Sequence, residues 1–174
     1  MPNAWLVELL RGLELFQGLK PHQLSAIARN TERVQFKPGD HIISEGEAGD
    51  AAYVIVAGAV IRSAGPASSD AVELGAGTLI GEMAMLVETT HSSTVVCREP
   101  VRALKITRAM LLEEMKNDPT LAEHILERLS ARLKRLADEL RSIDKVLAVP
   151  TRPAARRPTK PLLALAPPSR NIHP

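Results

Sequence analysis

The chain has 174 residues, of which 45% are hydrophobic and 24% are charged, a composition typical of one globular domain with some appended sequence. Its formal net charge is +2, but five basic residues and no acidic ones lie in residues 150–174, so the preceding domain is mildly acidic and a basic nucleic-acid-binding face is not expected. Glu8 and Arg11 interrupt the apolar N-terminal stretch, which therefore has the pattern of neither a signal peptide nor a membrane span, and we expect a cytoplasmic location.

Two short helices are predicted at the start of the chain. Between residues 4 and 29 the apolar residues recur at helical spacing. The sequence GLKP interrupts this pattern, and its Pro21 is suited to the first position of a second helix.

From residue 31 onward, short runs of β-type residues alternate with turn sequences such as KPGD and EGEAGD. The seven runs are ERVQF, HIIS, AAYVIVAG, AVIRS, AVELG, TVVC and VRALKI. Short strands at this spacing predict an α+β chain built on an antiparallel β-barrel or jelly roll, that is, a double-stranded β-helix. The only cysteine, Cys97, lies inside one of these runs, so we expect a buried structural thiol and no disulfide.

Helical patterns return after residue 106. Thr107 can cap the segment RAMLLEEMKN, and Asp118 followed by Pro119 is a typical start for a last helix over residues 119–147. Apolar residues in this helix are separated alternately by three and four positions, as in a coiled-coil seam: Leu126, Leu129, Leu133, Leu136, Leu140, Ile143 and Leu147. The narrow seam favours a parallel homodimer, although the same stripe could instead pack on the chain's own β-barrel.

The segment after residue 149 is rich in proline and has no periodicity, which predicts a disordered tail over residues 150–174. Its basic residues are Arg152, Arg156, Arg157, Lys160 and Arg170. The tail is either a solvated extension or a segment that docks on an acidic partner or a membrane surface. The folded domain is expected to occupy residues 1–149.

The stretch GEMAMLVETTHSSTV, residues 81–95, has the composition of a small-ligand pocket. Gly81 precedes a short apolar segment whose first amide groups, if helical, would attract an anion such as a phosphate. Glu82 lies in that first turn, and a polar patch that contains His91 and two serines follows.

The ordered set of IISEGEAGDAAYVIVAGAV, LGAGTLIGEMAML and a polar patch ending in STVV resembles the cyclic nucleotide-binding domain family. That family includes kinase regulatory subunits, nucleotide-gated channels and bacterial transcription activators of the catabolite-activator type. The likeness covers roughly residues 13–147 and implies cAMP or cGMP as a regulatory ligand, without a metal. The contacts it implies are Ile80, Gly81, Glu82, Met83, Ala84, His91, Ser92 and Ser93.

Two of these residues allow more than one interpretation. Glu82 could accept a hydrogen bond from the ribose 2′-hydroxyl, as the resemblance implies, or could simply complement the helix dipole. Nucleotide-binding members usually carry an arginine where this chain has His91, and histidine lacks both the permanent charge and the bidentate fork of arginine. His91 is therefore a weaker, pH-sensitive phosphate ligand, a sign of a lost site, or an adaptation to another ligand.

Other chemistries have little support in the sequence. The five histidines are scattered, so no metal site is expected, and neither a Gly-x-Ser-x-Gly nor a phosphate-loop motif is present, so we expect no enzyme. No helix-turn-helix follows the last helix, and direct sequence-specific DNA binding is not expected. The leading hypothesis is a regulatory module acting in trans on an unknown effector protein; the alternative is a dimeric interaction scaffold that binds no nucleotide.

Overall fold

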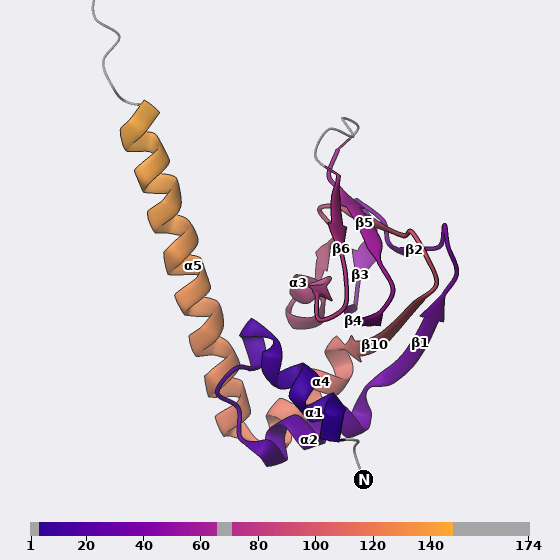
Figure 1. Cartoon of the computed structure of the whole chain (residues 1–174). Coiled ribbons are helices and arrows are strands. Elements are labelled where there is room, and N and C mark those ends of the chain that lie inside the picture. The colour runs from indigo at the N-terminus through magenta and orange to yellow at the C-terminus, as the bar shows by residue number, and fades with distance from the viewer. Residues whose placement is uncertain (1–3, 66–70, 148–174) are drawn as a thin grey trace, which may run out of the picture. The chain divides into compact units, whose positions relative to one another are not determined.

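The computed structural model describes residues 4–65 and 71–147, with side chains as far as residue 143 (Figure 1). The chain divides after Arg135 into two compact units, of which the first, residues 1–135, contains both main β-sheets and the beginning of the last helix. The tail predicted over residues 150–174 lies outside the described residues, so its disorder stays a prediction.

The N-terminal helices form as the sequence predicts. Helix α1 spans Ala4–Gly12, a 3-10 turn η1 spans Glu14–Phe16, and helix α2 spans Pro21–Asn30, with the proline at its first position. Their apolar faces are buried in one cluster, which includes Leu6, Leu10, Phe16, Leu24 and Ile27.

The strands form two four-stranded antiparallel sheets, ordered β1-β10-β4-β7 and β2-β9-β5-β6, and one two-stranded sheet of β3 and β8. Their bounds are β1 Glu32–Phe36, β2 His41–Ile43, β3 Ala48–Gly49, β4 Ala51–Ala57, β5 Val60–Ser63, β6 Val72–Leu74, β7 Leu79–Ile80, β8 Thr89–Thr90, β9 Thr94–Cys97 and β10 Val101–Thr107. The seven predicted strands are confirmed, as is the jelly-roll class, but the sheets do not close into the predicted β-barrel.

Two hydrophobic clusters explain the apolar pattern of the strands. One lies between the two main sheets and includes Ile55, Val60, Val95 and the buried Cys97. The other lies between the first sheet and the helices and includes Val54 and Leu104. Strand β4 contributes to both clusters, and for this reason its sequence AAYVIVA is apolar at nearly every position instead of alternating.

Three more helices follow within and after the sheets. Helix α3 spans Glu82–Leu86, α4 spans Arg108–Asn117 and α5 spans Pro119–Leu147. The hydroxyl oxygen of Thr107 accepts a hydrogen bond from the Met110 amide at 3.2 Å, which confirms the predicted cap of α4.

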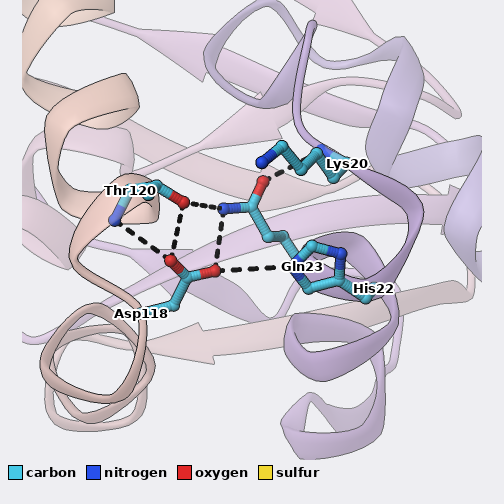
Figure 2. A network of polar contacts seen from close by, with 5 residues as sticks. All are labelled: Lys20, His22, Gln23, Asp118 and Thr120. Atoms are coloured by element: carbon cyan, nitrogen blue, oxygen red, sulfur yellow. Dashed lines mark hydrogen bonds and ion pairs between the residues drawn. The ribbon is translucent and has the colours of Figure 1, made fainter.

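A polar network connects the start of α2 to the junction of α4 and α5 (Figure 2). The side-chain amide of Gln23, which is only 4% exposed, donates to Asp118 Oδ2 at 2.9 Å and to Thr120 Oγ1 at 3.0 Å. Its oxygen accepts from the Lys20 amide at 2.9 Å, and His22 Nε2 lies 3.6 Å from Asp118 Oδ2. Hydrogen bonds from Thr120 and Gln23 lower the pKa of Asp118 to about 2.

Helix α5 has a buried beginning and an exposed seam. Leu121 and Ile125 are buried in the cluster beside the helices, and Leu129 packs partly against it. The other seam residues whose side chains are described are exposed: Leu126, Leu133, Leu136, Leu140 and Ile143. Within the first unit, Leu126 and Leu133 are thus not packed against the described sheets. Among the described residues, no helix is both long and apolar enough to cross a membrane.

Candidate functional site

Gly81 forms the corner between strand β7 and helix α3. Its φ of 73° lies in the left-handed region, and a Cβ there would lie 2.9 Å from the carbonyl oxygen of Ala51 on β4. Only glycine fits both conditions without strain, so the glycine of the GEMAML segment is needed for the backbone to turn directly into α3 beside β4.

The pairing of β3 with β8 holds the backbone of His91 in place. The register sets Ala48 opposite Thr90, and the His91 amide donates to the Glu47 carbonyl at 2.9 Å. The His91 carbonyl in turn accepts from the Gly46 amide at 2.8 Å. The turn sequence EGEAGD thus forms a support for the polar patch almost fifty residues later.

The imidazole of His91 packs against the backbone of Gly49. A Cβ added at Gly49 would lie 2.5 Å from His91 Nε2 and 2.6 Å from the Cβ of Ala84. Gly49 does not have a positive φ, so the close approach of His91 and α3, and not a turn conformation, requires glycine here.

These elements enclose a cavity of about 210 Å³ in the first unit. Every residue predicted as a ligand contact lines it: Ile80, Gly81, Glu82, Met83, Ala84, His91, Ser92 and Ser93. The structure therefore brings the two halves of the GEMAMLVETTHSSTV stretch together around one space, whereas their role toward a ligand stays a prediction.

Sequence reasoning missed several walls of this cavity. They are Ile43, Arg62, Leu79, Thr89, Thr90, Val95 and Arg132. Arg62 comes from β5 and Arg132 from α5, so the cavity has two guanidinium groups although the polar patch itself contains none. The last helix contains no aromatic residue, and Arg132 is the side chain by which it contributes to this cavity wall.

Arg132 pairs with Glu82 inside the first unit. Its Nη1 donates to both carboxylate oxygens of Glu82, at 2.7 and 2.6 Å. The hydrogen bonds with Glu82, and then the negative charge of that carboxylate, raise the pKa of Arg132. The acid predicted to accept a sugar hydroxyl is thus engaged with α5 in this structure.

The first amides of α3 are only partly available to an anion. The Ala84 amide donates to the Gly81 carbonyl at 3.0 Å. This leaves the amides of Glu82 and Met83 as the remaining donors at the start of a helix of only five residues. Fewer backbone amides are available to a phosphate at this turn than the sequence indicated. The predicted attraction therefore depends more on the neighbouring side chains.

Two further arginines connect α5 to the N-terminal segment. Arg128 donates to the Gln17 carbonyl at 2.7 Å, and Arg135 forms an ion pair with Glu14 of η1. The hydrogen bond and charge of Arg135 lower the pKa of Glu14. Arg128, Arg132 and Arg135 are spaced by four and three residues, so one side of α5 carries all three contacts.

The described residues contain no cluster of three or more histidine, cysteine or acidic side chains that could hold a metal ion. Larger hollows of about 460 and 400 Å³ lie beside Trp5 and beside Gln23. Neither contains a predicted ligand contact, so the cavity at Gly81 is the candidate site.

Residues 33–118 match the sequence model of the family described as "Cyclic nucleotide-binding domain". The chain is also 28% identical, over 138 residues, to the "CRP-like cAMP-activated global transcriptional regulator" of Mycobacterium tuberculosis (strain CDC 1551 / Oshkosh). This alignment covers 76% of the chain and 61% of the relative, so the chain spans less than two thirds of the curated relatives it matches.

Solved structures share the fold. The Thermus thermophilus Catabolite Activator Protein is 27% identical, with a TM-score of 0.62 over 76% of this chain and 63% of that one. The N-terminal domain of a transcriptional regulator from Streptomyces coelicolor A3(2) has a TM-score of 0.70 over 76% of this chain and 94% of that one. At 24% identity, the second likeness concerns the fold alone.

Proposed function

Because residues 33–118 match the model of the cyclic nucleotide-binding domain family, we propose that the chain is a regulatory domain that binds a cyclic nucleotide, cAMP or cGMP, in the cavity beside Gly81. The observation that carries this proposal is the gathering of all eight predicted contacts around one space. The cavity combines an acid, several hydroxyl groups and apolar walls, which suit a ligand with a sugar, a phosphate and a base.

Each part of such a ligand has a suitable partner. Glu82 would accept a hydrogen bond from the ribose 2′-hydroxyl, since an ionised carboxylate is a strong acceptor. Ser92, His91 and the amide of Met83 would donate to the cyclic phosphate. Replacing a bidentate guanidinium by His91 forfeits a charge-assisted contact worth about 1.5–3 kcal/mol, so the affinity would be roughly one to two orders of magnitude below that of an arginine-containing site.

The ion pair of Arg132 and Glu82 supports a route from the cavity to helix α5. A sugar hydroxyl that binds Glu82 competes with Arg132 for the same carboxylate oxygens. Binding would therefore weaken one of the contacts that hold α5, while those of Arg128 and Arg135 remain. The shift in the position or mobility of α5 would be the regulatory signal.

The proposed output surface is the exposed seam of α5. Five leucine and isoleucine residues of this seam are exposed among the described residues, and the alternate spacing of the seam by three and four residues suits a parallel pair of helices. We therefore infer a homodimer, which acts on a separate effector protein without catalysis. A cytoplasmic location and the absence of direct sequence-specific DNA binding belong to this proposal.

Isothermal titration calorimetry of the full chain with cAMP, cGMP and 5′-AMP tests the proposal. One of the cyclic nucleotides should bind and 5′-AMP should bind much more weakly. Glu82→Gln, which keeps the shape but not the charge, should weaken the binding about tenfold or more.

Thermal unfolding supplies a second readout, because a ligand at 100 times its dissociation constant stabilises the folded state by about 2.7 kcal/mol. No heat of binding and no rise in melting temperature at millimolar cyclic nucleotide would contradict the proposal. That result would favour the alternative, an interaction scaffold with an empty cavity.

A further inference from the structure

A hollow of about 460 Å³ lies beside Trp5 in the first unit. Helix α1 and strands β1, β4 and β10 contribute its walls: Trp5, Arg33, Val34, Gln35, Val56, Arg102, Ala103 and Leu104. None of these residues lines the cavity at Gly81. A space of this size, with mostly apolar walls and a few polar groups, is typical of a small-molecule site.

Strand pairing turns both arginines of this hollow toward the side of the sheet on which α1 packs. In the register of β1 and β10, Arg33 lies opposite Leu104, and Gln35 lies opposite Arg102. Directly opposed residues, and alternate residues of one strand, share a face of the sheet. Leu104 is buried in one cluster with Leu6 of α1, whereas Arg102 is exposed. The cover that the helices give this face therefore ends between Leu104 and Arg102, and the hollow lies at that border.

The hollow carries positive charge. Arg33 and Arg102 are diagonal neighbours on adjacent strands, about 7–8 Å apart at their Cα atoms. Within the described part of the chain neither forms an ion pair, and Glu8 of α1 pairs with Arg11 instead, at 2.8 Å. The described walls include no acidic residue, and the sequence of residues 1–3 contains none. This charge balance favours an anionic occupant.

The apolar part of the hollow suits a flat ring. The indole of Trp5 is 46% exposed, so a large aromatic surface remains in contact with solvent. Val56 and Leu104 add aliphatic surface to the same space. Aromatic rings pack favourably against an indole, and covering its exposed area is favourable in water. The walls thus combine a surface for an aromatic ring with two guanidinium groups.

We propose that this hollow is a second ligand site, which binds a small, flat aromatic carboxylate. The ring packs against Trp5, and the carboxylate accepts hydrogen bonds from Arg33 and Arg102, because the planar fork of a guanidinium matches the two oxygens of a carboxylate. This site is separate from the one proposed for a cyclic nucleotide and does not depend on it.

The test titrates the isotope-labelled full chain with naphthoate, followed by NMR and calorimetry. Trp5 is the only tryptophan, so its indole N–H gives a single signal that identifies the site directly. Naphthoate should shift this signal, with a dissociation constant of about 1 mM or lower for a ligand of this size. Naphthamide, which keeps the ring without the charge, should bind about 2- to 30-fold more weakly, since two exposed charge contacts are lost. Cyclohexanecarboxylate, which keeps the charge without a flat ring, should bind about 2- to 10-fold more weakly.

Paired substitutions test the two arginines. Arg33→Gln with Arg102→Gln should lower the affinity for naphthoate to that for naphthamide and leave naphthamide unchanged. Arg29→Gln with Arg141→Gln is the matched control, because it removes two charges at exposed positions that do not line the hollow. It should leave both affinities unchanged.

Charge reversal shows that a loss of binding is not a loss of folding. Arg33→Glu with Arg102→Glu should bind naphthylmethylammonium in preference to naphthoate, and the indole signal of Trp5 should again shift. Failure of the reversed variant to exchange its preference would contradict the role of the two arginines.

Other outcomes would overturn the proposal. No shift of the indole signal with millimolar naphthoate, or equal binding of naphthoate and naphthamide, would do so. Tighter binding of a tetra-aspartate peptide than of naphthoate would make the hollow a docking surface for an acidic protein segment. Competition by cAMP or cGMP would place naphthoate in the cavity at Gly81. Failure of cyclic nucleotides to bind would contradict only the function proposed above.

Discussion

A single nitrogen of Arg132, Nη1, donates to both carboxylate oxygens of Glu82, although the two residues are 50 positions apart in the sequence. This contact joins the first residue of α3 to α5, and both residues line the candidate cavity. One carboxylate, that of Glu82, thus takes part both in the wall of the cavity and in the attachment of α5.

The strength of this pair is measurable in the absence of nucleotide. Arg132 has a side chain that is 45% exposed and Glu82 one that is 19% exposed, so solvent screens the interaction. A double-mutant cycle with Arg132→Gln and Glu82→Gln, followed by urea unfolding, should give a coupling energy of about 0.2–1 kcal/mol. The coupling should decrease in 1 M salt. A coupling of zero in dilute buffer would contradict the role given to this pair.

The close packing at Gly49 predicts that this glycine is intolerant of even one methyl group. Gly49→Ala should destabilise the domain by about 1–3 kcal/mol, because His91 and α3 would have to move away. Gly75→Ala is the control, since no atom lies within 4 Å of the added Cβ and Gly75 does not have a positive φ. Thermal unfolding of both variants checks the prediction, which equal melting temperatures would refute.

Gln23 holds α2 to the start of α5 through a neutral amide (Figure 2). Gln23→Glu would set a second carboxylate against Asp118 and remove the buried donor, and should cost about 1–3 kcal/mol at pH 7. The loss should become smaller near pH 4, where the new carboxyl is protonated and donates again. Gln23→Leu, which has no titratable group, should be destabilised to the same extent at both pH values. Urea unfolding at each pH gives the comparison.

The lowered pKa of Asp118 predicts an acid-sensitive contribution to stability. Since the pKa is about 2 in the folded chain and 3.8 ordinarily, the ionised carboxylate stabilises the fold above pH 3.8, and this contribution is lost as the pH falls through 2. The melting temperature of Asp118→Asn should therefore lie below that of the wild type at pH 5–7, and the gap should close toward pH 2. A gap that does not change with pH would contradict this account.

The exposed seam of α5 predicts concentration-dependent association. Leu133 is 66% exposed and Leu140 is 65% exposed, so Leu133→Glu with Leu140→Glu should disrupt a helix pair without disturbing the core. Leu112→Glu on α4, at a leucine that is 41% exposed and lies outside the seam, is the control. Sedimentation equilibrium should detect a dimer for the wild type and the control, and a monomer for the seam variant. A monomeric wild type would contradict the proposed homodimer.

Much of the fold was predictable because its signals are local. Pro21, Thr107 and Pro119 mark helix starts, and seven apolar runs mark strands, all of which the structure confirms. Strands β3, β7 and β8 were missed because each has only two residues, too few for any alternation to be recognised. The sequence left a barrel and a jelly roll open, and only the structure shows that the sheets do not close, because closure depends on pairings between edge strands, which no single run encodes.

The candidate site was predictable only where its residues are adjacent in the sequence. The pocket segment and its polar patch fall within residues 80–93, and all eight predicted contacts line the cavity. Arg62 was missed because its place depends on the register of β5 against β9, between residues 33 positions apart. In the sequence AVIRS, an arginine in an alternating strand looks like an ordinary solvent-facing residue.

The burial of Cys97 makes the chain well suited to site-specific labelling. Cys97 is the only cysteine, it is 3% exposed, and burial raises the pKa of its thiol, so little reactive thiolate is available at neutral pH. A cysteine introduced at an exposed position of α5 should thus take up a maleimide spin label in preference to Cys97. Distances between two such labels would then report whether paired helices run parallel or antiparallel, without replacement of Cys97.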